Sequence, residues 1–190
     1  MISSPVLDRQ DYSKMAYTTG SDTDRDFYGT PQPWIDLCRK VMGGIELDPA
    51  SCQEANDRVV KADRFFNEEQ DALTQSWKCE TLFLNPPYSS VLTNRFATKF
   101  LEEWQAGKIR QAIILINNST ETKAFGMFDQ GSIRHAYPRS RIQFISTEGR
   151  SKNQNSRGQT FFYCGPRKKR FENVFFAANC RIVAPIRRAG

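Results

Sequence analysis

Two uninterrupted apolar segments constrain the fold of this chain more than any other feature. They are TLFL at residues 81–84 and QAIILIN at residues 111–117. Neither segment alternates between polar and apolar residues, which predicts strands buried on both faces, as in the middle of a parallel sheet. Apolar residues at helical spacing over residues 97–104 indicate a helix between them. A strand, a helix and a second buried strand in this order predict a doubly wound α/β fold.

The flanking segments continue this α/β pattern. Apolar residues recur at i, i+3, i+4 and i+7 from Trp34, which predicts an amphipathic helix over residues 33–42. Further helices are expected at residues 54–61 and 122–128, and short strands in GIELDPAS and DRFF. Near the end, RIQFIS, TFFYC and NVFFAA have the composition of strands. We therefore expect a mostly parallel sheet with an antiparallel hairpin at its C-terminal end and helices on both faces.

The length and composition indicate one globular domain. Residues 1–26 are polar and are predicted to be flexible, whereas residues 27–190 form the predicted domain. No apolar run approaches the roughly 18 residues that a membrane span needs, and the N-terminus lacks the pattern of a signal peptide. We expect no membrane contact and a location in the cytoplasm of a bacterial or phage-infected cell.

The cysteines and the histidine give little indication of a metal or disulfide site. The five cysteines form no CxxC pair and are odd in number, so we expect reduced thiols and no zinc site. His135 is the only histidine, which leaves little material for a Ser-His or multi-histidine mechanism. We expect His135 to be an ordinary packed or surface residue.

Positive charge is concentrated at the C-terminal end of the chain. Residues 1–133 contain 14 Lys and Arg against 19 Asp and Glu, whereas residues 134–190 contain 13 against 2. The basic part includes RKKR at residues 167–170 and IRR at residues 186–188. Such a distribution suits a polyanion, because phosphate contacts from Lys and Arg release condensed counterions. A solvated basic tail without a partner is the alternative.

Three polar loops are expected at one edge of the predicted sheet. They are LDPAS at residues 47–51, NPPY at residues 85–88 and NNSTET at residues 117–122. Ligands of open α/β sheets bind beyond the carboxyl ends of the strands, where these loops lie. The pattern therefore predicts a binding site formed by the three loops.

The NPPY loop offers two uncharged hydrogen-bond acceptors beside an aromatic ring. The prolines Pro86 and Pro87 fix the backbone, so Asn85 is held in a defined direction. The Asn85 side-chain oxygen and the Pro86 carbonyl can both accept hydrogen bonds, and Tyr88 follows them. This group suits a flat substrate that carries an NH2 group. The alternative is a Pro-Pro turn that only ends a strand.

The loop sequences, taken in order, resemble a known family. NPPY after an apolar strand is similar to the [DNS]-P-P-[YFW] motif of amino-group methyltransferases that use S-adenosylmethionine. More closely, YGTPQPW, ELDPAS, RFFNEEQDAL and LNPPYS resemble the phage-type DNA N6-adenine methyltransferases over residues 27–162. The resemblance implies a Rossmann-like methyltransferase sheet, S-adenosylmethionine as methyl donor, and the N6 amine of adenine in DNA as acceptor.

The resemblance also implies which residues bind the donor. They come from the TP segment at the methionine end, the LDPAS loop, and the acid of DAL that accepts a hydrogen bond from the donor's adenine. These residues would be Tyr28, Thr30, Pro31, Asp48, Pro49, Ala50 and Asp71. Singly, each has a local alternative, such as a helix cap or a turn former. The chain departs from many methyltransferases in having no glycine-rich first loop, and Asp63 is a weak candidate for the acid that binds the ribose.

The remaining site residues follow from the reaction. The catalytic group would be Asn85, Pro86, Pro87 and Tyr88, with Asn85 and Pro86 accepting the amine hydrogens and Tyr88 stacking on a base flipped out of the duplex. The polar loops and basic residues would hold the DNA phosphates through Asn118, Thr120, Arg150, Lys152 and Arg157. An RNA adenine, a protein glutamine amide, or a catalytically degenerate DNA-binding module are the alternatives.

Overall fold

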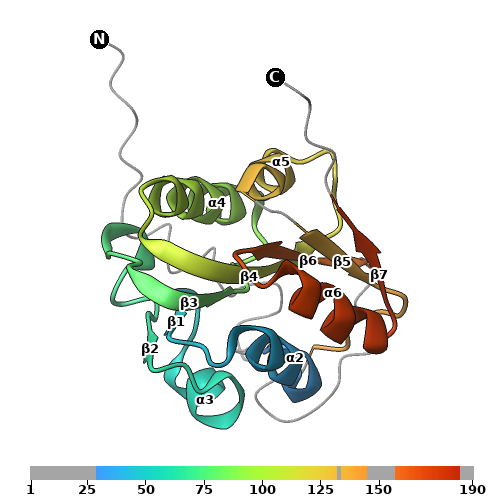
Figure 1. Cartoon of the computed structure of the whole chain (residues 1–190). Helices are drawn as coiled ribbons and strands as arrows, with labels where there is room; N and C mark the ends of the chain where they lie inside the picture. Colours follow the sequence, from blue (N-terminus) through green and yellow to red (C-terminus); the bar gives the residue numbers. More distant parts are fainter. Residues whose placement is uncertain (1–28, 132–133, 145–156, 185–190) are drawn as a thin grey trace, which may run out of the picture.

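The computed structural model describes residues 29–131, 134–144 and 157–184 of the chain. It contains a seven-stranded sheet with the strand order β2-β1-β3-β4-β6-β5-β7 (Figure 1). The strands are β1 (Leu47–Asp48), β2 (Arg64–Phe65), β3 (Cys79–Leu84), β4 (Ile109–Asn117), β5 (Arg134–Pro138), β6 (Gln159–Cys164) and β7 (Cys180–Val183).

The sheet has a parallel half and an antiparallel half. Strand β1 lies parallel to both β2 and β3, and β3 lies parallel to β4. Beyond β4, the pairs β4–β6, β6–β5 and β5–β7 are all antiparallel. This confirms the predicted Rossmann-like architecture with antiparallel strands at the C-terminal end, although three strands rather than a simple hairpin form that end.

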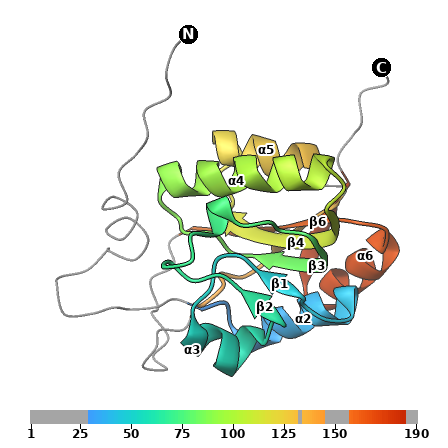
Figure 2. The ribbon, with the colours of Figure 1, turned by 90° about the vertical axis from the view of Figure 1, so that its left-hand side faces the viewer.

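Helices cover both faces of the sheet (Figures 1 and 2). Helices α4 (Ser90–Gln105) and α5 (Lys123–Gly131) pack on one face, and α2 (Gln32–Met42) and α6 (Lys168–Ala177) pack on the other. Three short helical segments complete the fold: α3 (Gln53–Ala55), the π-helical turn η1 (Asn56–Val60) and the 3-10 turn η2 (Ala72–Thr74). The helix predicted at residues 54–61 is present at residues 53–60, where α3 continues directly into η1.

The central strands are buried on both faces, as their apolar sequences predict. In β3, Phe83 belongs to the hydrophobic cluster under α2 and α6, whereas Leu82 and Leu84 belong to the cluster under α4 and α5. In β4, alternate residues divide between the same two clusters, and residues 111–116 are all buried. Because side chains alternate along a strand, a continuous apolar run can serve two cores at once.

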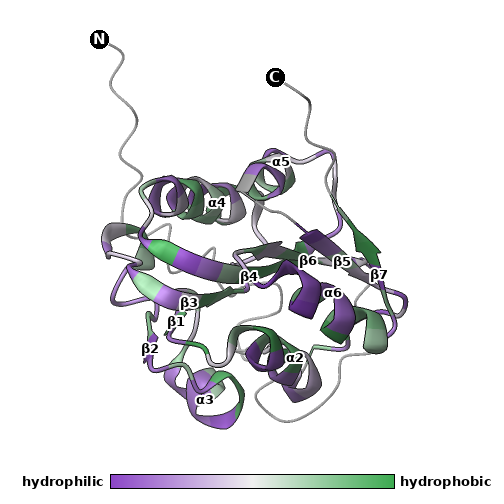
Figure 3. Cartoon of the chain, in the orientation of Figure 1, coloured by the Kyte–Doolittle hydropathy of each residue, from purple (hydrophilic) through white to green (hydrophobic). Residues whose placement is uncertain are grey.

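Two of the predicted C-terminal strands are wrong. The NVFFAA segment lies in α6, where Phe171, Val174 and Phe175 are buried at i, i+3 and i+4. Residues 141–144 of RIQFIS form no strand, although Ile142 and Phe144 are buried. Strands β5 and β7 were not predicted, because each is short and contains polar residues. Figure 3 shows hydrophilic residues in the first turn of α6, ahead of its apolar positions.

The cysteines and His135 have structural surroundings and lie mostly in the interior. The cysteines are free thiols, and four of them are buried. His135 is 5% exposed and lies 4.7 Å, ring to ring, from Phe162, away from the three loops. The described ranges contain no helix long and apolar enough to cross a membrane. They also contain no group of three or more His, Cys, Asp or Glu side chains that could hold a metal ion.

Candidate active site

The three predicted loops meet at one edge of the sheet. Strands β1, β3 and β4 are parallel, and they end at Asp48, Leu84 and Asn117 respectively. The loops LDPAS, NPPY and NNSTET therefore leave the sheet at its carboxyl edge. The N-terminal end of α2 reaches the same place, because Thr30, two residues before the helix, contacts Asn85. We call this edge the site edge.

Asn85 is held by hydrogen bonds on both ends of its side-chain amide. Its Nδ2 donates to Thr30 Oγ1 over 3.2 Å, and its Oδ1 accepts from the Tyr88 hydroxyl over 2.8 Å. Thr30 is 3% exposed, so its hydroxyl is a fixed partner. An amide whose nitrogen is bonded to Thr30 must direct its oxygen the other way, toward Tyr88.

The backbone of the NPPY loop is fixed by the start of α4. The Thr93 hydroxyl donates to the Pro87 carbonyl over 2.6 Å, and the Ser89 hydroxyl caps α4 by accepting from Leu92 N over 3.3 Å. Within the described part of the chain, no group donates a hydrogen bond to the Pro86 carbonyl. The Pro86 carbonyl is therefore not used by another described group, although Pro86 itself is a buried residue.

Tyr88 connects the NPPY loop to the antiparallel half of the sheet. Its hydroxyl lies 3.4 Å from Gln159 Oε1, and its ring meets Phe144 edge to face with the centroids 6.0 Å apart. Tyr88 is 40% exposed as a residue, while its hydroxyl contacts Asn85 and Gln159. Burial of the hydroxyl raises the pKa of Tyr88 above its usual value, so Tyr88 is a neutral hydrogen-bond donor.

Gln159 extends this polar chain to Asn117, the first residue of the predicted NNSTET loop, and sequence reasoning named neither residue individually as part of the site. Gln159 Nε2 donates to Asn117 Oδ1 over 2.9 Å, and Gln159 is 4% exposed. The pairing of Asn117 with Gln159 in the β4–β6 ladder brings these two amides together. The sequence does place an amide side chain at one end of each of two apolar strands. Only the pairing of β4 with β6 shows that these two side chains meet at the site edge.

Asp48 is a buried carboxyl group at the end of β1. It is 2% exposed, and its Oδ1 accepts a hydrogen bond from Ala50 N over 3.1 Å. Burial raises the pKa of Asp48 to about 7, and the Ala50 N–H opposes this only in part. No cationic side chain in the described ranges pairs with Asp48. The site edge therefore contains a carboxyl group without a cation.

Asp71 lies in a neighbouring loop that is tied to the Asp48 loop. Phe66 N donates to the Asp48 carbonyl and Ser51 N donates to the Phe66 carbonyl, each over 3.1 Å. Asp71 has a positive φ of 45°, unusual for a residue other than glycine, and its Oδ1 accepts from Leu73 N over 3.2 Å. Asp71 therefore does cap the turn η2, which occupies one of its two oxygens.

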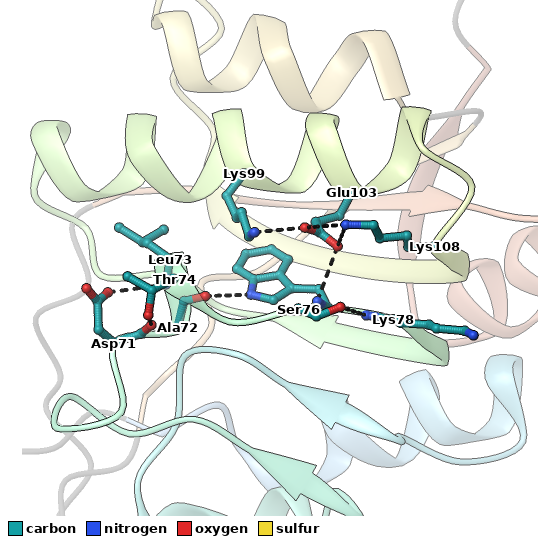
Figure 4. Close-up of polar contacts among 10 residues, drawn as sticks. Asp71, Ala72, Leu73, Thr74, Ser76, Lys78, Lys99, Glu103 and Lys108 are labelled. Atoms are coloured by element: carbon teal, nitrogen blue, oxygen red, sulfur yellow. Dashed lines mark hydrogen bonds and ion pairs between the residues drawn. The ribbon is translucent and has the colours of Figure 1, made fainter. Parts of the chain in front are cut away.

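The Asp71 loop is anchored to the protein core through Trp77 (Figure 4). Trp77 Nε1 donates to the Ala72 carbonyl over 2.8 Å, and Trp77 N lies 3.3 Å from Glu103 Oε2. Glu103 is in turn held by Lys99 at 2.7 Å and Lys108 at 3.1 Å. This buried chain of contacts fixes the turn that presents Asp71.

The other predicted residues divide into three groups. Pro49 is buried and Ala50 is half-buried in the Asp48 loop, and Pro31 precedes α2. The predicted DNA contacts Asn118, Thr120 and Arg157 are exposed at the site edge. Tyr28, Arg150, Lys152 and the predicted flexible segment at residues 1–26 lie outside the described residues.

Asp63 does not belong to the site. Its N–H donates to the Ile45 carbonyl ahead of β1, and it stands before the first residue of β2 rather than after the last. It therefore lies at the opposite edge of the sheet from Asp48.

Comparison with known proteins agrees with this geometry. Residues 17–181 match the family model described as DNA N-6-adenine-methyltransferase (Dam). A DNA N-6-adenine-methyltransferase of Haemophilus phage HP1 (strain HP1c1) is 27% identical over 155 residues, covering 80% of this chain and 86% of the phage protein. One of Escherichia phage T1 is 27% identical over 160 residues, covering 76% of this chain and 65% of the phage protein. Because the family model spans most of its length, the chain belongs to the DNA N-6-adenine-methyltransferase (Dam) family.

Proposed function

We propose that this protein transfers a methyl group from S-adenosylmethionine to the N6 amine of adenine in DNA. Membership of the Dam family supports the reaction and the substrate. The observation that supports the assignment of residues is the fixed orientation of the Asn85 side chain, which places Asn85 Oδ1 at the site edge next to the NPPY prolines.

The chemistry of the site edge fits the donor. S-adenosylmethionine supplies a methyl group on a positively charged sulfur, together with an ammonium group and hydroxyl groups that need acceptors. Asp48 is a buried carboxyl group that no cation of the described residues neutralises, so it suits the cationic or hydroxylated part of such a molecule. Asp71 caps η2 with Oδ1 only, so its second carboxylate oxygen can accept a hydrogen bond from an adenine amine.

Asn85 and Pro86 would act on the target amine. The lone pair of an aromatic amine is delocalised into the ring, which makes the nitrogen a poor nucleophile. Hydrogen bonds from both N–H groups to Asn85 Oδ1 and the Pro86 carbonyl favour a more tetrahedral nitrogen with a localised lone pair. No general base is needed before transfer, since the amine becomes acidic only once it carries the methyl group.

Tyr88 would change partners when the target base enters. In the structure its hydroxyl occupies the Asn85 Oδ1 acceptor that the amine needs. A base stacked on the Tyr88 ring and bonded to Asn85 must therefore displace this hydroxyl, which can turn to the Gln159 Oε1 acceptor 3.4 Å away. Tyr88 thus satisfies Asn85 in the free protein and stacks on the base in the complex.

Incubation with labelled S-adenosylmethionine and separate DNA, RNA and protein pools tests the proposed substrate. We expect label in DNA, on adenine. Label in RNA alone or on protein glutamine would replace DNA by one of the two enzymatic alternatives. Donor binding by calorimetry without transfer to any pool would support the degenerate DNA-binding module instead.

A further inference from the structure

Strand β5 carries the chain to the site edge a second time. Its pairing with β6 is antiparallel, and β6 is antiparallel to β4, so β5 and β4 run in the same direction. Ala136 pairs with Phe161, which in turn pairs with Leu115. The strand ends at Pro138, level with the last residues of β4. Residues 139–144 therefore follow the carboxyl end of β5 along the site edge.

The segment of residues 139–144 is anchored by alternate apolar side chains. Ile142 is 1% exposed and Phe144 is 8% exposed, and both belong to the hydrophobic cluster under α2 and α6. Arg139 and Arg141 are exposed. Because Phe144 meets the Tyr88 ring, the same short segment that supports Tyr88 also carries two arginines at the site edge.

The RKKR run, by contrast, lies at the opposite edge of the sheet, and its two arginines form hydrogen bonds within the protein. Arg167 Nη1 donates to the Met42 carbonyl over 2.9 Å and the Val41 carbonyl over 3.2 Å. Arg170 Nε donates to the Lys40 carbonyl over 2.6 Å. These carbonyls belong to the C-terminal turn of α2, whereas the N-terminal end of α2 faces Asn85. Because a helix of 11 residues is about 16 Å long, α2 separates these contacts from the site edge by about that distance. Both arginines cap α2, and Figure 2 shows α6 beside α2.

We propose that Arg139 and Arg141 contact the DNA phosphates that flank the target adenine, and that the RKKR run does not contact DNA. This inference rests on the proposed function. Strand β5 lies three positions from β3 in the sheet, and neighbouring strands are about 4.8 Å apart, so the end of β5, beside Arg139, lies about 14 Å from the NPPY loop along the sheet edge. Arg141 lies closer to that loop, because Phe144, three residues later, meets the Tyr88 ring.

The decisive experiment compares two double variants that lose the same charge at opposite edges. Arg139→Ala/Arg141→Ala removes the proposed contacts, and Lys168→Ala/Lys169→Ala removes two exposed cations from the first turn of α6. DNA affinity is measured for each over a series of salt concentrations, beside donor affinity and the thermal midpoint. A third variant, Arg139→Lys/Arg141→Lys, keeps both charges but removes the planar guanidinium groups. It shows whether positive charge alone is enough for the phosphate contacts.

We expect Arg139→Ala/Arg141→Ala to weaken DNA binding about 10-fold or more and to reduce the slope of log affinity against log salt by about 2, since each phosphate contact contributes about 1. Donor affinity and thermal midpoint should match the unmodified protein, and the lysine variant should restore most of the affinity. The Lys168→Ala/Lys169→Ala protein should retain the full slope.

If the unmodified protein methylates DNA, two results would overturn the inference. One is an unchanged salt slope in Arg139→Ala/Arg141→Ala, and the other is an equal loss of DNA affinity in the two alanine variants. Absence of DNA methylation by the unmodified protein would instead remove the proposed function, and the inference with it.

Discussion

The Asn85 amide nitrogen donates to Thr30 Oγ1 over 3.2 Å, which joins the N-terminal TP segment directly to the NPPY loop. The family resemblance implies a donor-binding role for Thr30. The structure adds a second role, because a buried hydroxyl that holds the Asn85 nitrogen also determines where the Asn85 oxygen points. Thr30 is therefore a positioning residue for the proposed acceptor of the target amine.

Replacing Thr30 by Val should lower kcat about 10-fold to 100-fold. The valine has nearly the same shape but cannot accept from Asn85 Nδ2, and a buried unpaired donor costs about 1–3 kcal/mol. Thr30→Ser keeps the hydroxyl and should retain most of the activity. Steady-state kinetics with donor titration by calorimetry would check this, and a valine variant that loses donor affinity but not kcat would contradict the positioning role.

Replacing Tyr88 by Phe should leave methyl transfer within about twofold of the unmodified protein or raise it. The phenylalanine keeps the ring for stacking and removes the hydroxyl that occupies Asn85 Oδ1 in the free protein. Tyr88→Ala loses the ring as well, and should weaken binding of DNA with an extrahelical base about 10-fold to 100-fold. Equal, severe losses in both variants would show that the hydroxyl has a role in the reaction.

Asp48 should make the free protein less stable as the pH rises. Burial raises the pKa of Asp48 to about 7 from an ordinary value of 3.8, so the folded chain holds this proton more tightly than the unfolded chain does. The resulting stabilisation is complete below about pH 4 and is lost as the pH rises to about 7. Asp48→Asn removes this dependence and should raise the free energy of unfolding at pH 8 by roughly 2–4 kcal/mol.

Denaturant unfolding of Asp48→Asn and the unmodified protein at pH 5 and pH 8, without donor, measures that difference. The gap between the two proteins should widen with pH, while the asparagine variant binds the donor more weakly. A gap that does not change with pH would show that the Asp48 carboxyl is not desolvated in the free protein.

The sequence predicts those parts of the fold and the site that depend on local pattern. Strands β3 and β4 followed from continuous apolar runs, and the site edge followed from the polar loops after them. The α6 segment was misassigned because Phe and Val favour strands by composition, whereas their i, i+3, i+4 burial favours a helix.

Longer-range features could not be predicted from local sequence. Gln159 joins the site only because β6 pairs with β4, and Phe144 reaches Tyr88 across more than fifty residues of chain. The RKKR run has the composition of a phosphate-binding surface, but the sequence does not show that Arg167 and Arg170 cap α2. Pairing and helix direction decide these cases, and neither is a property of the local segment.

Quantification of N6-methyladenine in DNA treated with the unmodified protein and with Asn85→Ala tests the central claim most directly. Removing an acceptor that acts mainly in the transition state should lower methyl transfer by about 100-fold to 1,000-fold, while donor affinity by calorimetry stays within about twofold. The unmodified protein should produce N6-methyladenine in DNA, and Asn85→Ala should produce almost none. Full methylation by Asn85→Ala would contradict the assignment of Asn85 to the target amine.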